Sequence, residues 1–322
     1  MITLEIDKKP DKDWNKRLIS SIGGNIYQTK EFAVHLQRQG QKPLFIKFIN
    51  EKGKIISQLL INNYSRFRNK GAKGKLLNKL PGLSKDVFSW TYGPVFFDEI
   101  YLNDVYSELG KLLISKKCRV LGKTNPIFSG DTRTLKKNFQ LVEWATFLID
   151  LRIGKEAIIA NIDKHSGRKN IERSVKRGVT VEEITGKNIG DYVNLKNKMN
   201  EENQNLIKVE DMLDSWRLLK PIGYGGIIAR LGEIVTGGLF FSSFNGLIIE
   251  GGVARSKEDY EMKLYSQDLI KWKIIEWGIE NNMKYYDLAG YNPHPKTAKE
   301  EGIKRYKAKW GGVSKPYWFI KK

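Results

Sequence analysis

The first clear pattern along the chain is a pair of short apolar runs. Residues 43–61, PLFIKFINEKGKIISQLLI, contain two such runs, and a polar Glu-Lys-Gly turn at 51–53 separates them. Two short apolar runs around a glycine-containing turn predict an antiparallel β-hairpin. After a basic, irregular stretch, the apolar segment 87–97, VFSWTYGPVFF, predicts a further strand.

The spacing of the apolar residues then changes to that of a helix. Val105, Leu109 and Leu112 recur at helical spacing, and Asn103 stands where an N-cap is expected. Residues 118–126, CRVLGKTNP, return to the pattern of a strand. The first half of the chain therefore predicts a hairpin, a strand, a helix and a strand.

The same order recurs in the second half. Residues 226–243, GIIARLGEIVTGGLFFSS, predict a hairpin that turns at 231–233, and residues 246–255, GLIIEGGVAR, predict a third strand. A long helix is expected over roughly residues 260–282. Its apolar stripe consists of Tyr265, Leu269, Trp272, Ile275 and Ile279. Residues 284–290, KYYDLAG, predict the closing strand.

Two such units predict a duplicated α/β (α+β) fold, in which each domain is a mixed, mainly antiparallel sheet flanked by helices. A polar, turn-rich stretch at 128–138 separates the units, so we expect one domain over residues 1–140 and a second over residues 141–312. The strand-like segment 144–151, WATFLIDL, opens the second domain. SKPYWFI predicts a last strand, and a return of residues 313–322 to the first domain is one way to dock it.

Composition adds a strong positive charge. Of the 322 residues, 56 are Lys or Arg and 36 are Asp or Glu, which gives a formal net charge of +20. The apolar fraction of 40% supplies a core and excludes wholesale disorder. A charge of this size attracts nucleic acid, anionic lipid or phosphorylated substrates. A lysine-rich, solvated surface is the alternative explanation.

The few cysteines and histidines limit the chemistry. Cys118 is the single cysteine, which rules out an intrachain disulfide and a zinc site built from cysteines. His35, His165 and His294 lie too far apart for a local ligand motif, so no metal is expected. The first residues, MITLEIDKKPDKDW, have no apolar signal core, and no apolar run is long enough to span a bilayer. We expect a monomeric, cytoplasmic protein without a cofactor that touches membranes only at their surface.

Two segments concentrate the positive charge. In residues 165–180, HSGRKNIERSVKRGVT, an expected helix begins at Ser166 and ends at Gly178. Its cations are Arg168, Lys169, Arg173, Lys176 and Arg177. The helix either lies along a phosphate backbone or is a plain charged surface helix. Residues 63–79, NYSRFRNKGAKGKLLNK, predict a basic loop that is a second candidate contact with RNA.

A third basic segment interleaves cations with aromatic residues. Residues 301–312, EGIKRYKAKWGG, place Tyr306 and Trp310 among four cations and end in two glycines. The cations are Lys304, Arg305, Lys307 and Lys309. The segment is either a solvated basic surface or a site for an anionic partner.

The order of elements resembles the GNAT acyltransferase fold, duplicated, and the details resemble the Fem family of peptidyltransferases in its short two-domain form. The landmarks, in the family's order, are GGNIYQTKEFAVHL, YGPVF, WATFLIDL, SGRKNIERSVKRGVTVEE, IVTGGLFFSSFNGLIIEGGVAR, YYDLAG and GIKRYKAKWGG. Longer members carry a helical arm, for which there is no room between Asn205 and Lys208. The resemblance implies an enzyme that moves an amino acid from aminoacyl-tRNA to an amino group of a cell-wall peptide precursor.

The resemblance also implies roles for particular residues. The family's aromatic-lysine pair corresponds to Tyr306 and Lys307, and the lysine is implicated in the transfer. An ammonium group can stabilise the oxyanion that develops when an amine attacks the ester, or a lysine can relay the proton to the leaving ribose oxygen. Gly251, Gly252 and Val253 lie on the strand that lines the acyl donor in GNAT folds. Contacts with tRNA or phosphate are expected from the helix cations above and from Lys304, Arg305 and Lys309.

Two departures limit the substrates. GNAT enzymes cradle the pyrophosphate of acetyl-CoA in a glycine-rich turn, but residues 255–264, RSKEDYEMKL, contain no glycine and three acidic residues, Glu258, Asp259 and Glu261. Relatives that use a UDP-linked precursor hold its phosphates with a lysine and an arginine. In this chain the lysine would fall at or near Leu36 and the arginine near Asn203, and neither residue is basic, although His35 and Arg38 lie close to the first position. The acceptor therefore stays open between a lipid-linked, a nucleotide-linked and another amine.

Two other functions remain open on the sequence. One is a non-catalytic basic module on a GNAT scaffold that binds RNA or anionic lipid. The other is an N-acyltransferase that uses acyl-CoA.

Overall fold

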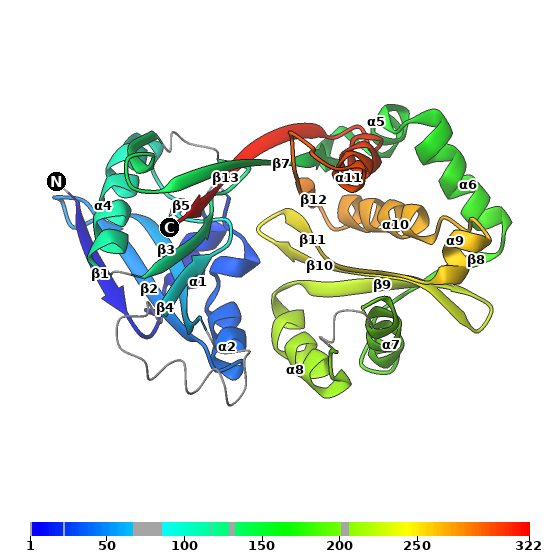
Figure 1. Cartoon of the computed structure of the whole chain (residues 1–322), viewed down its shortest axis with the longest axis horizontal. Coiled ribbons are helices and arrows are strands. Elements are labelled where there is room, and N and C mark those ends of the chain that lie inside the picture. Colours follow the sequence, from blue (N-terminus) through cyan, green and yellow to red (C-terminus); the bar gives the residue numbers. More distant parts are fainter. Residues whose placement is uncertain (1, 22, 67–85, 117, 129–132, 201–205) are drawn as a thin grey trace. The chain divides into compact units, whose positions relative to one another are not determined.

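The computed structural model describes residues 2–21, 23–66, 86–116, 118–128, 133–200 and 206–322. Most of the basic segment 63–79, the second predicted RNA contact, lies outside the described residues. The chain forms two compact units, Met1–Ala145 with Lys315–Lys322, and Thr146–Ser314 (Figure 1). Two strands, β7 (Gln140–Asp150) and β13 (Val313–Lys321), each contain a boundary between these units.

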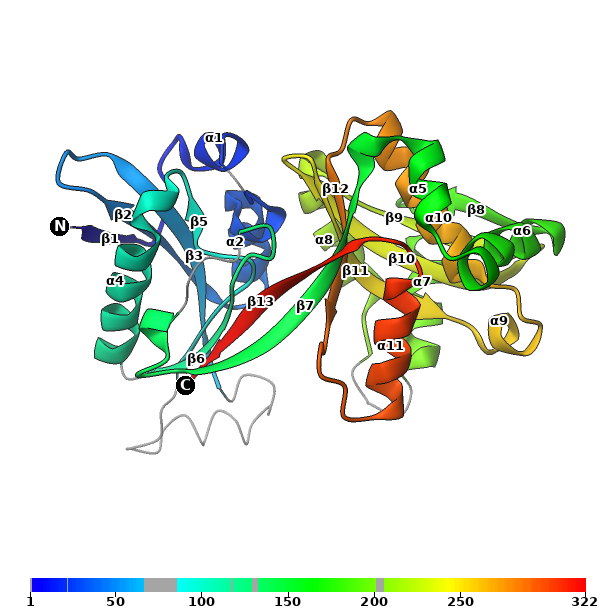
Figure 2. The ribbon, with the colours of Figure 1, turned by 90° about the horizontal axis from the view of Figure 1, so that it is seen from above.

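The first unit is a mixed sheet with helices on both faces (Figure 2). Its strands follow the order β1-β2-β3-β4-β6-β13, in which only β4 and β6 run parallel. Their bounds are β1 (Thr3–Asp7), β2 (Lys42–Ile49), β3 (Ile55–Ser65), β4 (Asp86–Trp90) and β6 (Arg119–Lys123), and the short β5 (Val95–Phe96) pairs with β3. The helices are α1 (Trp14–Ile19), η1 (Ile26–Gln28), α2 (Lys30–Arg38), η3 (Glu99–Tyr101), α4 (Leu102–Ser115) and η4 (Arg133–Leu135).

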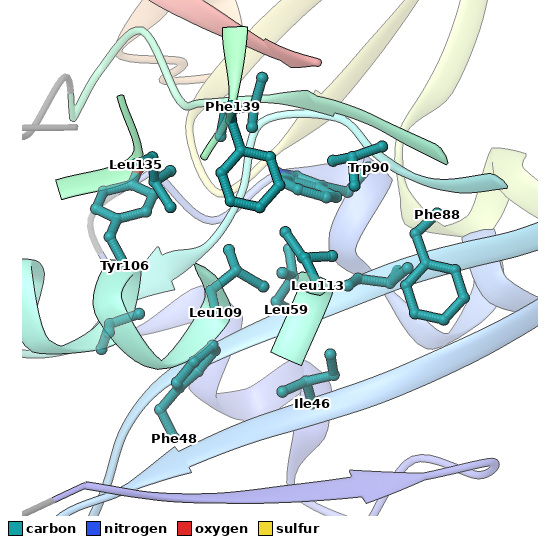
Figure 3. Close-up of a cluster of buried hydrophobic side chains, with 14 of the residues drawn as sticks. Ile46, Phe48, Leu59, Phe88, Trp90, Tyr106, Leu109, Leu113, Leu135 and Phe139 are labelled. Carbon is teal, nitrogen blue, oxygen red and sulfur yellow. The ribbon is translucent and has the colours of Figure 1, made fainter. Parts of the chain in front are cut away.

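The predicted hairpin at 43–61 is confirmed as β2 and β3. Asn50 closes its turn by accepting hydrogen bonds from the N–H groups of Lys52 (3.1 Å) and Lys54 (3.0 Å). Gly53 supplies the left-handed backbone, with φ at 74°, that the turn needs. Alternate residues of the strands then enter the core, where Figure 3 shows Ile46, Phe48 and Leu59 with side chains of α4.

The predicted helix after Asn103 forms as α4, but its start was wrong. The Asp98 side chain accepts the Ile100 N–H (3.2 Å) and starts the 3-10 turn η3, so the chain is already helical when it reaches Asn103. Val105, Leu109 and Leu113 are fully buried on the face that packs against the sheet. This burial, rather than the cap, holds the helix in place.

The second unit repeats the mixed sheet. Its strands follow the order β7-β12-β11-β10-β9-β8, with β11 and β12 parallel and β8 to β11 antiparallel. Their bounds are β8 (Val179–Glu183), β9 (Tyr224–Leu231), β10 (Ile234–Phe244), β11 (Leu247–Arg255) and β12 (Tyr285–Tyr291). The predicted second hairpin is thereby confirmed as β9 and β10.

Helices cover both faces of this second sheet. Figure 1 shows α10 (Ser266–Glu280) on one face of β9 to β11, and α7 (Ile189–Met199) and α8 (Val209–Leu219) on the other. The remaining helical segments are η5 (Leu151–Ile153), α5 (Lys155–Asn161), η6 (Lys164–Arg168), α6 (Lys169–Lys176), η8 (Lys220–Ile222), α9 (Lys257–Glu261) and α11 (Ala298–Ala308).

The single helix predicted over 260–282 is wrong, because the chain forms α9, a break and then α10. Lys263 and Tyr265 adopt left-handed backbone angles, with φ at 54° and 60°. The fully buried Asp259 causes the new start, since its carboxylate accepts the Ser266 N–H (2.8 Å) at the first residue of α10. No glycine or proline marks this break in the sequence.

Strands β11 and β12 pair only at their beginnings. The parallel ladder joins Leu247–Ile249 to Tyr285–Asp287 and goes no further. On its other side β11 carries a bulge, because Glu250 faces Phe241 and Val253 faces Leu239, which leaves Gly251 and Gly252 opposite one residue. The two parallel strands therefore separate from Glu250 onward, and the candidate site lies where they part.

Candidate active site

The basic segment 301–312 is for the most part a helix. It begins after Thr297, whose hydroxyl accepts the Glu300 N–H (3.2 Å), and its acidic first turn and basic last turn suit the helix dipole. The two glycines after it are needed for packing. A Cβ on Gly311 would come within 2.4 Å of the Asn161 carbonyl oxygen, and one on Gly312 within 2.9 Å of the Leu148 carbonyl oxygen. These contacts fix the last turn of α11, which carries Lys307.

Lys307 reaches from α11 to the end of β12. Its Nζ donates hydrogen bonds to the carbonyl oxygens of Ala289 and Gly290, both at 2.9 Å. Ala289 is in the left-handed region, with φ at 60°. Asp287 holds that turn by accepting the Ala289 N–H (2.7 Å), and Thr146 bridges the Asp287 carboxylate and the Ala289 carbonyl. The strand end is thus shaped to turn two carbonyl groups toward one lysine.

The surroundings of Lys307 favour its neutral form. Burial lowers the pKa of its ammonium most strongly, and the positive charge of Lys271 lowers it further. The carboxylates of Glu250 and Asp287 act in the opposite direction, yet the pKa stays below the ordinary lysine value. A neutral Nζ can give its two N–H groups to the two carbonyls and keep a lone pair for a proton, whereas an ammonium has a third N–H to offer.

Glu250 lies at the point where β11 leaves β12. Its carboxylate forms an ion pair with Lys271 of α10 and accepts the Tyr286 hydroxyl (2.7 Å) from β12. The side chains of Glu250 and Lys271 are only 4% and 3% exposed. Burial, and then the charge of Glu250, raise the pKa of Tyr286 well above its ordinary value, so this phenol stays a proton donor. Buried ion pairs add little net stability, which points to a role beyond folding.

A second buried pair lies beside the first. Lys309 Nζ contacts the Asp268 carboxylate at 2.5 Å, and Asp268 also accepts the Asn170 amide (3.1 Å). The Tyr306 ring lies 4.1 Å from Lys309 Nζ and 5.7 Å from Lys271 Nζ. Burial, followed by the charges of Asp268 and Glu250, raises the pKa of Tyr306 well above its ordinary value. Tyr306 thus stays neutral at physiological pH and lies near the lysines of both ion pairs.

The predicted contact residues of α11 have different surroundings. Lys309 is engaged in its buried ion pair, and Lys304 donates to the Pro293 carbonyl oxygen (3.0 Å) inside the same unit. Arg305 is exposed. Only Arg305 therefore points to solvent as the prediction required.

The basic helix of residues 165–180 also begins earlier than predicted. Asp163, not Ser166, caps it, because the Asp163 carboxylate accepts the N–H groups of His165 (3.1 Å) and Ser166 (2.6 Å). The cap opens a π-helical turn, η6, which runs into α6, and Gly178 follows the end of α6 with φ at 80°, as expected. Its exposed cations are Lys169, Arg173, Lys176 and Arg177, whereas Arg168 is half-buried.

The predicted donor strand is β11. Gly252 has no room for a side chain, since a Cβ would come within 2.4 Å of the Tyr192 hydroxyl, and a Cβ on Gly251 would come within 2.9 Å of the Phe240 carbonyl oxygen. The Val253 carbonyl oxygen accepts a hydrogen bond from Lys196 Nζ (2.7 Å). The glycines therefore allow the bulge that separates β11 from β12.

The acidic junction at 255–264 needs one correction. Asp259 does not repel an anion, because it is fully buried and paired with Arg255. Glu258 and Glu261 are exposed, so two carboxylates rather than three face outward. At the predicted precursor-binding positions, Leu36 is buried on α2, and Asn203 lies outside the described residues.

Sequence reasoning missed four members of this cluster: Asp268, Lys271, Glu250 and Tyr286. A signal for two of them was present, because Glu250 interrupts an apolar strand and Lys271 lies between apolar residues of a helix. Asp287, two positions before Ala289, supports the end of β12 through its hydrogen bond to the Ala289 N–H.

Within the described part of the chain, no helix is long and apolar enough to cross a membrane. Nor do any three His, Cys, Asp or Glu side chains of the described residues come together as a metal site.

No protein-family model matches the sequence, and no curated protein matches it. Several solved structures do match the structure of this chain. The crystal structure of FemX aligns with a TM-score of 0.73 over 98% of this chain and 97% of that chain, at 12% identity. The C-terminal domain of a putative lysylphosphatidylglycerol synthetase from Agrobacterium fabrum aligns with a TM-score of 0.58 at 11% identity, over 95% of this chain and 92% of that chain.

A tandem GNAT protein from the clavulanic acid biosynthesis pathway aligns with a TM-score of 0.55 at 10% identity, over 100% of this chain and 98% of that chain. At such identities the likeness is one of fold. The chain has a FemX-like fold built from two GNAT-like domains, which confirms the fold and the resemblance predicted from the sequence.

Proposed function

We propose that this chain is an aminoacyltransferase that moves an amino acid from aminoacyl-tRNA to an amino group of a cell-wall peptide precursor. The observation that carries the proposal is Lys307, a partly exposed lysine of lowered pKa at the parting of β11 and β12. The FemX-like fold supports it. We place the acyl donor where these two strands separate.

The reaction forms a C–N bond and breaks the ester bond to the ribose. The acceptor amine attacks the ester carbonyl, so a proton must leave the nitrogen and reach the ribose oxygen. Neutral Lys307 takes that proton, and the resulting ammonium lies beside the oxyanion and stabilises it. The ammonium then gives the proton to the leaving oxygen, which restores the neutral lysine. The ester is already activated, so positioning supplies much of the remaining rate.

The buried neighbours tune this lysine. Glu250 and Asp287 favour the ammonium, and Lys271 and burial favour the neutral amine, so the balance lies nearer to neutral pH than for a free lysine. Tyr286 keeps the Glu250 carboxylate in place with a hydrogen bond of 2.7 Å. A base that must both accept and return a proton works better as its pKa falls toward the working pH, which is the direction of this shift.

Contacts with the tRNA backbone are assigned to exposed cations. Lys169, Arg173, Lys176 and Arg177 of α6 and Arg305 of α11 are exposed and belong to the same unit as Lys307. Phosphate contacts of this kind position a nucleic acid without reading its sequence. Lys304 and Lys309 support the site from inside instead, through their internal partners.

The acceptor is proposed to be a lipid-linked precursor or another peptide amine. The buried Leu36 offers no charge for the phosphates of a nucleotide-linked precursor. The acyl-CoA alternative is disfavoured by the junction at 255–264, which lacks the glycines of a pyrophosphate loop and keeps two outward carboxylates. Calorimetry should find weak acetyl-CoA binding or none, and tight binding would favour that alternative.

The decisive experiment incubates the protein with a pool of charged tRNAs and candidate acceptors. We expect one amino acid, or a small set, to leave the tRNA only when its acceptor is present. RNA binding without any transfer, across lipid-linked, nucleotide-linked and free peptide acceptors, would favour a non-catalytic module instead.

A further inference from the structure

Tyr260 is an exposed aromatic side chain mounted on a fixed cation. Its surface is 64% exposed, and the Arg255 guanidinium lies 3.3 Å from the centre of its ring. Arg255 in turn is paired with Asp259, which is fully buried and anchored to the start of α10 by the Ser266 N–H (2.8 Å). Large exposed rings are normally free to move, but this ring stacks on the Arg255 guanidinium, which Asp259 holds in place.

A cavity of about 810 Å³ opens beside this ring. Its walls come from α7, from the start of β10 and from residues 255–260, and Lys198 and Lys257 contribute positive charge to it. Two of its acids have cationic neighbours. Asp191 is paired with Arg230 (2.5 Å). Hydrogen bonds to its own backbone N–H and to Ser256 lower the pKa of Glu258, and the charges of Lys198 and Lys257 lower it further. Three acids of the lining, Asp191, Glu233 and Glu258, balance its three cations, Lys198, Arg255 and Lys257, so the cavity offers an aromatic face rather than an anion site.

Arg255, beneath the ring, lies on the same strand as the candidate active site, and Tyr260 follows it in α9. Glu250 and Arg255 are five positions apart on β11, which is about 16 Å of extended chain. The positive charge of Arg255 reaches the active-site cluster: it opposes the rise that burial and Asp268 cause in the pKa of Tyr306, and it adds to the fall that burial causes in the pKa of Lys309. A chain that places its reactive end at Lys307 can thus pass Arg255 and then Tyr260.

We propose that Tyr260, backed by Arg255, is a stacking platform for an unpaired base near the 3′ end of the donor RNA. This rests on the proposed function, in which the amino acid arrives as an ester of that end. Every base has a π-face, so a ring of this kind holds a single strand in place without selecting its sequence. At the junction where a GNAT enzyme would cradle a pyrophosphate, this chain presents a ring instead.

The test uses short single-stranded RNAs that end in CCA, with 2-aminopurine placed at each of the last three positions in turn. Stacking on Tyr260 should quench the fluorescence at one position. Tyr260→Ala should remove that quenching and weaken binding by about 5- to 150-fold, the range for the loss of one stacked base. Tyr260→Phe, which keeps the ring, should retain both.

A matched control comes from a second arginine–tyrosine contact. The Arg152 guanidinium lies 4.7 Å from the ring of Tyr285, at the start of β12. Tyr285→Ala should leave both quenching and affinity unchanged. Since stacking neutralises no phosphate, Tyr260→Ala should also leave the slope of log affinity against log salt unchanged, whereas Lys257→Gln should reduce it by about 0.7 if that lysine contacts the strand.

The outcomes separate the platform from the proposed function. Equal quenching and affinity in the wild type and Tyr260→Ala would overturn the platform. A wild type that transfers from tRNA but quenches no probe would overturn it too. In both cases the proposed function stands if transfer is observed. A wild type that neither binds the probes nor transfers an amino acid overturns both. Lys307→Met should lose transfer and keep the quenching.

Discussion

The Lys307 Nζ lies 2.9 Å from the carbonyl oxygen of Ala289, a residue held in a left-handed backbone conformation. For an alanine this conformation costs about 1–2 kcal/mol. Its consequence is that successive carbonyls, those of Ala289 and Gly290, both accept hydrogen bonds from the same side chain. Local backbone strain at a strand end next to buried charges is typical of sites under functional constraint.

Replacing Lys307 with Met should remove transfer while leaving the fold nearly intact. Methionine keeps much of the stem and loses only the nitrogen that handles the proton. We expect a single-turnover rate about 100- to 1,000-fold lower, the usual loss when one stabilising group is removed. Lys299→Met, at an exposed position of the same helix, is the control and should keep the wild-type rate. Equal rates for Lys307→Met and wild type would contradict the catalytic role.

Lys309→Met should destabilise the protein instead. The change leaves the Asp268 carboxylate, which is 5% exposed, without its ion-pair partner. Breaking a buried pair from one side costs about 3–5 kcal/mol. Urea denaturation should show this loss, and Lys309→Met combined with Asp268→Asn should recover part of it. If the single variant were as stable as the wild type, the pair would not be buried in solution.

Two glycines of one segment allow a matched test of the packing that positions Lys307. Gly311→Ala forces a side chain to within 2.4 Å of the Asn161 carbonyl oxygen at a φ of 72°, so the free energy of unfolding should fall by more than about 1 kcal/mol. Gly302→Ala, inside α11 with nothing within 4 Å, should instead raise it by about 0.5–1 kcal/mol. Thermal unfolding of both variants decides the matter. A neutral Gly311→Ala would mean that the turn after α11 is free to shift.

Local signals predicted the hairpins, because two short apolar runs and the turn between them lie within twenty residues. They failed at the break between α9 and α10, since its cause is a carboxylate, Asp259, that must be buried before it can start a helix at Ser266. An apolar stripe continues across the break and conceals it. Propensity carried no warning, because Lys263 and Tyr265 are not residues that favour a left-handed backbone.

The candidate site was predictable only in part. Lys307 and Tyr306 were identified through a resemblance, since spacing alone does not distinguish them from other cations and rings of the segment. Lys309 looked the same in sequence, yet its side chain turns inward to Asp268. Glu250 and Lys271 lie 21 positions apart and meet only because β11 and α10 pack together. A buried pair of this kind depends on the tertiary fold.

Binding of tRNA should depend steeply on salt. Each phosphate that a cation neutralises contributes about 0.7–0.9 to the slope of log affinity against log salt. Lys169→Gln with Lys176→Gln, both exposed on α6, should reduce that slope by this amount for each phosphate that is no longer neutralised. Lys116→Gln, an exposed lysine just after α4 in the other unit, is the control and should leave it unchanged. A flat salt dependence of the wild type would argue against nucleic acid as the partner.

The pH profile of transfer tests the state of Lys307 directly. If neutral Lys307 takes the proton, the rate should rise with pH and level off above a midpoint that lies below the ordinary lysine pKa of about 10.4, because burial and Lys271 favour the neutral amine. Glu250→Gln removes a negative charge that favours the ammonium, so its midpoint should move to lower pH.

Charged groups face Lys307 from three elements: Glu250 on β11, Lys271 on α10 and Asp287 on β12. Removing Glu250 also frees Lys271 from its partner, and that positive charge moves the midpoint in the same direction. Lys271→Met acts oppositely, since it removes a charge that favours the neutral form, so its midpoint should rise. Single-turnover rates across the pH range, with saturating acceptor, measure all three proteins. A midpoint that moves the same way in both variants, or in neither, would mean that the profile reports the acceptor amine rather than Lys307.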